Sequence, residues 1–286
     1  MIDILLSSLN LSVKITLLIF GLMIIIELLV LKYKDKVIKI IKYNKISKYI
    51  VPSFFGIIPG CIGTFAMDSL YMAGLLGFGG ITAVMIATSG DEAFLLISMV
   101  AAGEIPLLTV VYLTVILFAM GIIGGKLADL FIKKYKIKFC EKCGIINHGD
   151  KEFKFKHFIK EHIYKHIIKK HIWRVFIWLF AAISIIGIIQ ANIGQEITFS
   201  GANLFYVLII ASLIGLLPIS GPNVFFIVMF SKGMIPFSVL LANSIIQDGH
   251  GLLPIMGFSM KDTIKIKLFN FVFGFIVGLI LLLVGF

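Results

Sequence analysis

Long apolar stretches alternate with short polar ones along almost the whole chain. Residues 14–32, 104–125, 173–191 and 266–285 are apolar runs of about 20 residues, the length that a helix needs to cross the hydrocarbon core of a membrane. Only 14% of the 286 residues are charged, whereas soluble domains carry about 25%. The pattern therefore predicts an all-α polytopic membrane protein and excludes a large soluble domain.

Two further apolar segments carry glycine, proline and acidic residues, which are unusual inside a spanning helix. Each segment has two interruptions: near Pro59 and at 89–92 in segment 49–101, and near Pro218 and at 247–251 in segment 204–258. Glycine and proline weaken or break a helix, and carboxylates inside a bilayer usually face a pathway or a partner. We therefore expect an ion or substrate site at these interruptions.

The two halves of the chain match when the first half is shifted by 159 positions. Seven of the 46 positions from 54 to 99 are then identical, and four of the seven are Gly or Pro at the expected breaks. Gly56 falls on Gly215, Pro59 on Pro218, Gly74 on Gly233 and Gly90 on Gly249. Because the spans 14–32 and 173–191 also coincide, the sequence predicts an internal repeat.

Basic residues are concentrated in two blocks. Of the 26 Lys and Arg residues, seven lie in 32–48 and thirteen in 126–170. Such blocks occur in nucleic-acid-binding proteins, but beside apolar spans they are typical of cytoplasmic loops. We therefore expect a multi-pass protein of the plasma (inner) membrane with a cytoplasmic central loop and no nucleic-acid partner.

The loops that correspond in the two halves carry opposite charge. The basic loop 32–48 corresponds to 192–203, which has no base, and 101–103, which has no base, corresponds to the basic loop 260–267 with Lys261, Lys265 and Lys267. Equivalent loops therefore lie on opposite sides of the membrane. This predicts two inverted-topology repeats, with both chain termini outside.

The predicted organisation has three parts, namely a first membrane repeat over 14–125, a basic cytoplasmic loop over 126–172 and a second membrane repeat over 173–285. The segments 49–75 and 204–234 are either pairs of full crossings, which gives about ten transmembrane segments, or re-entrant hairpins, which gives three crossings per half. Inverted repeats with paired broken helices are typical of secondary transporters, whose substrate binds near the midplane where the repeats meet.

Polar side chains gather at the interruptions. The candidate substrate or metal ligands are Ser89, Asp91 and Glu92 at the first, Asn243, Gln247, Asp248 and His250 at the second, and Asp68 and Asn223 after the two proline breaks. Lys232 is the only base in 49–125 and 204–258, so the interior favours a cation or proton over an anion. Alternatively, Asp91 or Asp248 simply caps the half-helix that follows it.

Oxygen ligands combined with one imidazole suit a divalent transition metal, and Mn²⁺ fits this mixture. We expect the site to be formed by Asp91, Glu92, Asp248 and His250. Metal ligands must be deprotonated, so proton coupling through the same carboxylates is expected. The sequence contains no GxxxxGK[ST] phosphate-binding motif and no nucleophile that indicates an enzyme. It leaves a homo-oligomer open.

Two alternatives use other residues. An arsenite or other metalloid oxyanion exporter would bind its substrate at half-helix N-termini, with Cys61 as a soft ligand. A metal-sensing membrane protein or channel would instead use the central loop, where Cys140 and Cys143 have the spacing of a zinc site and His148 follows.

Four motifs carry a resemblance to a known family. They are IPGCIGTFAMDSLY at 58–71, ATSGDEAF at 87–94, LLPISGPN at 216–223 and IPFSVLLANSIIQDGHGLLP at 235–254. In these stretches the chain resembles a bacterial family of ten-helix heavy-metal exporters, whose members are labelled manganese transporters or arsenic efflux proteins. The resemblance implies about ten helices and export of a metal or metalloid. Our expectation from the sequence is a secondary transporter that exports a divalent metal, most of all manganese.

Overall fold

The structure, a computed structural model, describes residues 4–21, 24, 47–72, 74–135, 172–193, 199, 201–218 and 220–286, and all regular structure in them is helical. This confirms the predicted all-α class. Four helices are long and apolar enough to cross a membrane: Ile4–Gly21, Phe78–Ala101, which contains a break, Leu107–Lys134 and Met260–Val284.

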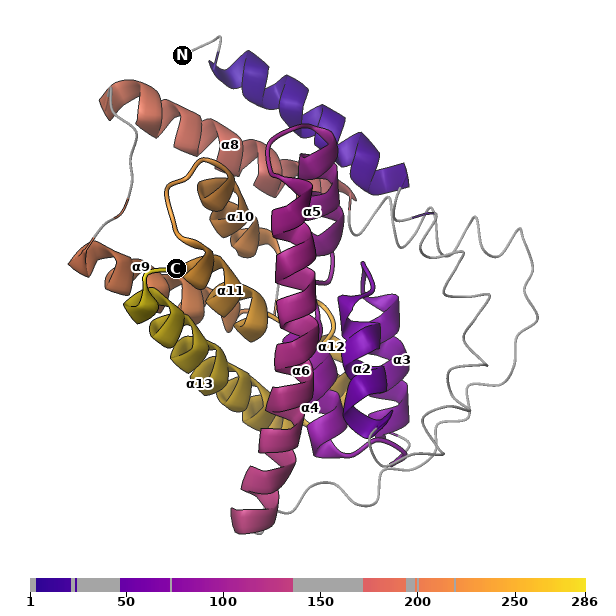
Figure 1. Ribbon diagram of the computed structural model, residues 1–286. Helices are drawn as coiled ribbons and strands as arrows, with labels where there is room; N and C mark the ends of the chain where they lie inside the picture. Colours follow the sequence, from indigo (N-terminus) through magenta and orange to yellow (C-terminus); the bar gives the residue numbers. More distant parts are fainter. Residues whose placement is uncertain are drawn as a thin grey trace, which may run out of the picture.

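The described helices fall into two groups along the chain (Figure 1). After the helix Ile4–Gly21, the first group continues with α2 (Ser47–Ile57), α3 (Ile62–Met72), α4 (Phe78–Ala87), α5 (Glu92–Ala101) and α6 (Leu107–Tyr135). The second group consists of α8 (Trp173–Ile193), α9 (Ala202–Gly215), the short 3-10 helix η2 (Gly221–Asn223), α10 (Val224–Ser231), α11 (Phe237–Ile246), α12 (Leu253–Phe258) and α13 (Met260–Val284).

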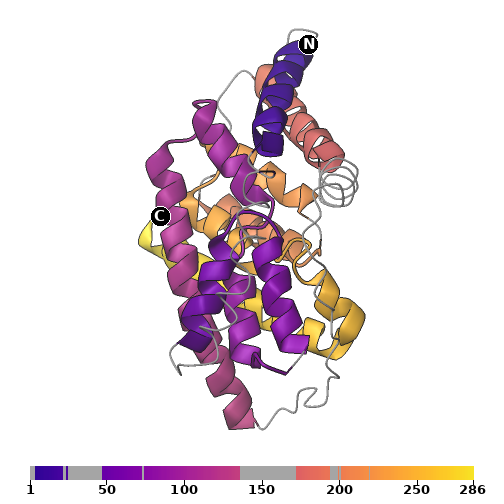
Figure 2. The same ribbon diagram turned by 90° about the vertical axis from the view of Figure 1, so that its right-hand side faces the viewer.

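Helices α2 and α3 lie side by side as the two arms of a hairpin (Figures 1 and 2). Asp129 on α6 binds both Lys48 at the start of α2 (Oδ2 to Nζ, 2.8 Å) and the amide of Gly79 at the start of α4 (Oδ1 to N, 2.8 Å). The tip of the hairpin lies at the break between α4 and α5, where the Gly60 amide donates to the Gly90 carbonyl at 2.9 Å. Segment 49–75, the first of the two left open by the sequence, is therefore a helical hairpin, and its position relative to the membrane stays a prediction.

The length of the arms agrees with this arrangement. Helices α2 and α3 have 11 residues each, so each rises only about 16 Å, half of the roughly 30 Å hydrocarbon core. Each arm is therefore too short to cross a membrane by itself.

Helices α9 and α10 form a second hairpin that opens at the other end of the molecule. The Phe199 amide donates to the Met234 carbonyl at 3.1 Å, which joins the start of α9 to the turn after α10. In the same turn, Lys232 forms an ion pair with Glu104, in the turn between α5 and α6, at 2.8 Å. Because α4 and α5 together run from Asp129 to Glu104, the two hairpins enter from opposite ends, which we call the Asp129 end and the Glu104 end.

The breaks after α4 and α11 follow the same backbone path. Thr88 (φ −74°, ψ 127°) and Gln247 (φ −73°, ψ 130°) end the two ten-residue helices in extended conformations. Two residues later, Gly90 and Gly249 have φ values of 47° and 51°, a left-handed conformation that glycine adopts without strain. The predicted interruptions are therefore present, and their conformations repeat at a spacing of 159 residues.

Small residues allow the central helices to pack closely. All ten residues of α4 are buried, and Gly121 and Gly125 place α6 directly against it. A Cβ atom at Gly121 would lie 2.7 Å from the Ala83 carbonyl oxygen. Gly274 and Gly278 of α13 have the same relation to α11. Such small-residue contacts are the usual way in which membrane helices approach one another.

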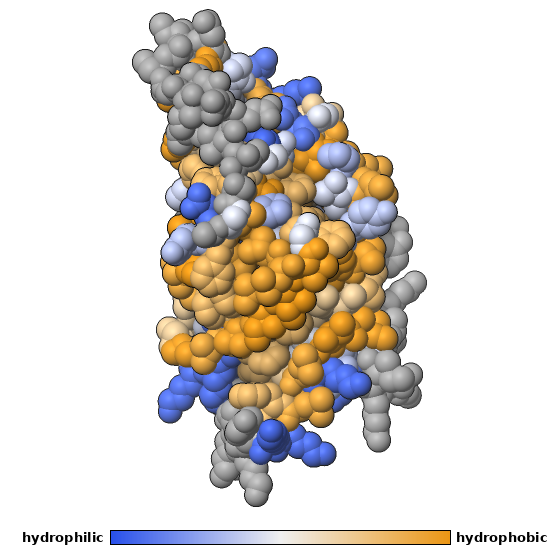
Figure 3. Space-filling model, turned by 60° about the vertical axis from the view of Figure 1, so that its left-hand side comes forward, coloured by the Kyte–Doolittle hydropathy of each residue, from blue (hydrophilic) through white to orange (hydrophobic). Residues whose placement is uncertain are grey.

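The outer helices turn an apolar stripe outward. On α13 the exposed residues recur every four positions, at Ile264, Leu268, Val272, Ile276 and Ile280. The opposite stripe is buried and holds Lys267, Asn270, Gly274 and Gly278. In Figure 3 a broad apolar band crosses the middle of the visible face, with hydrophilic residues gathered above and below it. This distribution suits a helix between lipid and a polar interior.

Three helix boundaries differ from the predicted ones. The first helix already includes Ile4 rather than beginning at residue 14, and within it the Ser12 hydroxyl donates to the Ser8 carbonyl at 2.6 Å. Helix α6 continues to Tyr135 instead of ending at 125. The remainder of the expected span 14–32 beyond residue 24, and residues 136–171 of the central loop, lie outside the described residues.

The third boundary changes the charge distribution. Helix α13 begins at Met260, where Ser259 accepts the Asp262 amide as an N-cap at 3.3 Å. The three lysines expected in a loop at 260–267 are therefore helical, and Lys267 is only 9% exposed. Consequently Lys232 is not the only base among the apolar segments, since Lys267 is buried among them.

The glycine contacts can be tested by alanine substitution. We expect Gly121→Ala and Gly125→Ala each to destabilise the protein by about 1–3 kcal/mol, because the new methyl group would overlap the backbone of α4. Gly257→Ala is the matched control, since a Cβ there meets nothing within 4 Å. Thermal unfolding in detergent measures the effect. Equal melting temperatures for all three variants would contradict the close packing of α6 on α4.

Candidate functional site

Four chain interruptions meet in the interior, and each contributes one polar side chain. Cys61 comes from the tip of the first hairpin, Asp91 from the break before α5, Ser220 from the tip of the second hairpin and His250 from the break before α12. The Cys61 sulfur lies 3.9 Å from Asp91 Oδ1, and Asp91 Oδ2 lies 3.7 Å from His250 Nδ1. Ser220 Oγ lies 3.5 Å from the same nitrogen of His250.

Glycines shape the backbone that carries these side chains. Gly60 (φ 92°), next to Cys61, has a left-handed conformation and donates its amide across to the break before α5. A Cβ at Gly249 would lie 2.8 Å from Ser220 Oγ, in addition to requiring a positive φ. The glycines therefore let the hairpin tips approach the breaks closely enough for the four side chains to meet.

One thiol, one carboxylate and one imidazole form a group that could hold a metal ion. Ligand atoms of Cys61, Asp91 and His250 all lie within 4.8 Å of one another. In a tetrahedral zinc site, bond lengths of 2.0 to 2.3 Å place neighbouring donor atoms about 3.5 Å apart. The Asp91–His250 and Cys61–Asp91 separations, 3.7 and 3.9 Å, are close to this value. The group is almost enclosed, because only the His250 side chain retains appreciable exposure, at 15%.

Amide side chains link the breaks to the hairpins. Asn243 donates to the Ala211 carbonyl (2.8 Å) and to Asn223 Oδ1 (3.0 Å), which connects α11 with the second hairpin. Gln247 donates to the Thr88 carbonyl at 3.4 Å and so joins the two breaks. These amides therefore act as ties between the elements that carry the site.

Two acidic side chains near the site have unsatisfied oxygen atoms. Asn223 hydrogen-bonds the buried Glu92 carboxyl group, whereas Glu92 Oε1 has no hydrogen-bond partner among the described residues. Asp68 is 0% exposed, and neither of its oxygens has such a partner. Buried polar atoms without partners call for an ion or a water molecule, and oxygen acceptors of this kind suit a cation.

Asp248 lies in the same break as His250 but has a different environment. Its Oδ2 atom lies 2.7 Å from Lys267 Nζ, and its Oδ1 atom accepts from Asn270 Nδ2 at 2.9 Å. Both partners are on α13. The carboxylate is thus engaged by its own half of the molecule and is not a member of the Cys61 group.

The structure brings together only part of the ligand set expected from the sequence. Asp91 and His250 meet as expected, and neither acid caps a helix: Asp91 makes no capping bond, and α12 begins at Leu253, well after Asp248. Ser89 is buried in the first break. The expected loop site, Cys140, Cys143 and His148, lies outside the described residues.

Sequence reasoning missed Ser220 and Lys267, and it considered Cys61 only as a metalloid ligand. A signal for Ser220 existed, because it lies 159 positions after Cys61, and His250 lies 159 positions after Asp91. For Lys267 the signal was its position on the buried stripe of α13.

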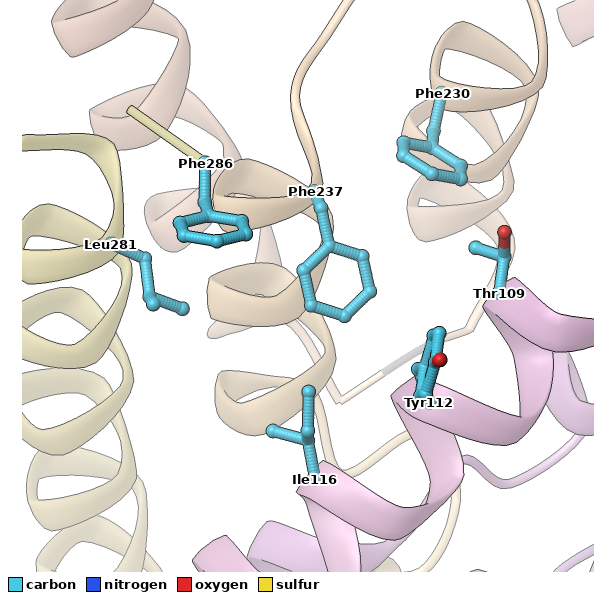
Figure 4. Close-up of a pocket in the computed structure, with 7 residues that line it drawn as sticks. All are labelled: Thr109, Tyr112, Ile116, Phe230, Phe237, Leu281 and Phe286. Atoms are coloured by element: carbon cyan, nitrogen blue, oxygen red, sulfur yellow. The ribbon is translucent and has the colours of Figure 1, made fainter. Parts of the chain in front are cut away.

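A large surface pocket elsewhere has the wrong chemistry for a metal ion. A cavity of about 510 Å³ lies between α6, α10, α11 and α13. Figure 4 shows its lining, which consists of Thr109, Tyr112, Ile116, Phe230, Phe237, Leu281 and Phe286. The side chains are almost entirely carbon, so the pocket suits an apolar chain, and the group of Cys61, Asp91 and His250 is the candidate site.

The comparisons identify a family of membrane proteins. The sequence model of a family described as "Putative, 10TM heavy-metal exporter" matches residues 7–204 and 156–284. No curated protein and no solved structure matches the chain. In the part of the chain that the structure describes, each half contributes five helical segments when each broken helix and each hairpin arm is counted once. The chain belongs to this family of ten-helix heavy-metal exporters.

Proposed function

We propose that the chain is a secondary transporter that exports a divalent metal ion, which binds between Cys61, Asp91 and His250 where two inverted repeats meet. The observation that carries this proposal is the convergence of three metal-ligating side chains from separate interruptions in a nearly enclosed interior. Unwound backbone at the depth of the membrane is tolerated where it lines a cavity, and transporters bind their substrates at such places.

The relation between the halves supports inverted repeats. The two hairpins open at opposite ends, and the two breaks share their backbone angles at a spacing of 159 residues. Residues separated by this spacing also touch each other: Gln247 contacts Thr88, and His250 contacts Asp91. In a two-fold arrangement only positions beside the axis contact their own equivalents. We therefore infer a pseudo-two-fold axis through the site.

Reciprocal contacts support the same axis. Thr64 of the first half lies against Gly251 of the second, because a Cβ at Gly251 would be 2.6 Å from Thr64 Cγ2. The equivalent pair is Asn223 with Glu92, which are hydrogen-bonded. Thr64 is equivalent to Asn223, and Gly251 is equivalent to Glu92. Exchange of the two halves therefore converts one contact into the other, as in a self-complementary interface.

The buried charges favour a cation over an oxyanion. Among the described residues around the breaks, four carboxyl groups belong to Asp68, Asp91, Glu92 and Asp248, and Lys267 is the only buried lysine. Such an interior repels an anion and attracts a divalent cation. Arsenite remains the second candidate because Cys61 offers a thiol at the centre of the site. This hypothesis predicts that transport depends on Cys61 and does not respond to divalent metals.

The thiol changes the expected metal. Manganese was predicted from oxygen ligands and one imidazole, whereas the observed group also contains sulfur. Thiolate and imidazole together favour borderline ions such as Zn²⁺ over Mn²⁺. We therefore propose Zn²⁺ or a similar ion as the cargo, with manganese as the alternative. Binding would displace protons from the ligands, which provides a route to proton-coupled export.

Metal binding can be measured by thermal stability of the purified protein. We expect Zn²⁺ well above its dissociation constant to raise the melting temperature of the wild type on the order of 5–10 °C. The double variant Asp91→Asn/His250→Ala should lose this shift and metal export from loaded vesicles. Cys61→Ser should weaken the response to Zn²⁺ more than the response to Mn²⁺, because sulfur selects the softer ion.

Asp262→Asn is the matched control for this experiment. Asp262 is as well buried as Asp91, but it lies near the Asp129 end, where it accepts from Tyr71 at 3.1 Å. This variant should keep the metal response. The proposal fails if the double variant still responds to every metal and still exports it. Stabilisation by arsenite alone would establish the second candidate instead.

The inverted topology can be tested by labelling from one side of the membrane. In a background with Cys61, Cys140 and Cys143 replaced by serine, a membrane-impermeant maleimide should react with Lys232→Cys on intact cells. Lys261→Cys, at the Asp129 end, should react only after permeabilisation. Labelling of both sites, or of neither, on intact cells would rule out opposite orientations of the two hairpins.

A further inference from the structure

Lys267 is a buried cation that the proposed metal site does not use. Its ammonium group lies 2.7 Å from Asp248 Oδ2, 3.0 Å from the Gly215 carbonyl oxygen and 3.2 Å from the Ile246 carbonyl oxygen. The two carbonyls each accept a hydrogen bond from the ammonium group, and the Asp248 carboxylate forms an ion pair with it. The buried charge is therefore balanced within the protein.

The three oxygens form a cation site in their own right. Gly215 is the last residue of α9 and Ile246 is the last residue of α11, so both carbonyls lie at helix C-termini, where the helix dipole is negative. Carbonyls at the ends of half-helices, together with a carboxylate, are the ligands that transporters use for monovalent coupling ions. Here the end of a lysine side chain occupies that position.

The first half is built in the same way without this charge. The residues 159 positions earlier are Gly56, Ala87 and Ser89, so the two carbonyls are kept but the carboxylate is replaced by a hydroxyl. For the helices α6 and α13 the spacing is 153 residues, because Gly121 and Gly125 make the same kind of contact as Gly274 and Gly278. With this spacing, the residue equivalent to Lys267 is Thr114. Thr114 donates to the Val110 carbonyl of its own helix at 2.8 Å.

The close packing of the helices does not require the ion pair. Helices α4 and α6 pack closely with no ion pair at the corresponding place. A buried ion pair is also a weak source of stability, because the cost of removing both charges from water offsets their attraction. The Asp248–Lys267 pair is therefore an addition to the second half and not a requirement of its fold.

We propose that Lys267 is a built-in cation that permanently occupies a second, monovalent cation site made by Asp248 and the C-terminal carbonyls of α9 and α11. Its tethered ammonium takes the place of a free ion such as Na⁺ or K⁺. The chain therefore needs no monovalent cation at this site. The inference does not depend on which metal the first site carries.

Removal of the tethered charge should create a requirement for a free one. In choline chloride, Lys267→Met should melt on the order of 10 °C below the wild type, because Asp248 loses its buried partner. Addition of Na⁺ or K⁺ should restore much of this loss with a saturable concentration dependence. The wild type should not respond, and neither should the control Lys232→Met, whose lysine pairs with Glu104 outside the core.

A second variant distinguishes a cation site from a structural ion pair. Asp248→Asn/Lys267→Met removes both charges, and we expect it to fold and to be insensitive to Na⁺ and K⁺. The proposal is overturned if Lys267→Met folds but responds to no monovalent cation. It is equally overturned if Lys267→Met cannot be purified in any salt while the double variant can, since the lysine would then serve only to neutralise Asp248.

Discussion

The need to satisfy backbone polar groups away from water governs the interior of this protein. A continuous helix satisfies its own amides and carbonyls, but each of the four interruptions leaves some of them without intrahelical partners. The interruptions meet these needs in pairs: the Gly60 amide reaches the Gly90 carbonyl, and the Gln247 side chain reaches the Thr88 carbonyl. Because the interruptions must lie together, their polar side chains converge as well, and the site follows from the same constraint.

Close packing around α4 and α11 keeps this convergence in place. Every residue of α4 and nine of the ten residues of α11 are buried, and glycines of α6 and α13 bring the outer helices into backbone contact with them. Ligands that extend from the ends of such helices are held more firmly than ligands on surface loops. The hairpins are held in the same way, since Gly56 of α2 lies directly against Val84 and Ala87 of α4.

The sequence reveals the broken helices because glycine and proline act locally. Gly90 and Gly249 mark turns that only their own backbone determines. Which group a buried carboxylate contacts depends on tertiary packing. The sequence therefore could not show that Asp91 faces His250 whereas Asp248 faces α13. The sequence predicts a loop at Lys267 because two other lysines precede it within seven residues. Its burial in the protein interior follows only from the start of α13 at Met260.

The unequal chemistry of positions 159 residues apart has a consequence for how a single metal centre can form between the two halves. Cys61 is equivalent to Ser220, and Asp91 to His250, so each half supplies different donors. Two identical half-length chains paired around the same axis would have presented every donor twice. In the proposed two-fold arrangement, a centre with a single thiol, a single carboxylate and a single imidazole therefore requires two halves that differ in sequence.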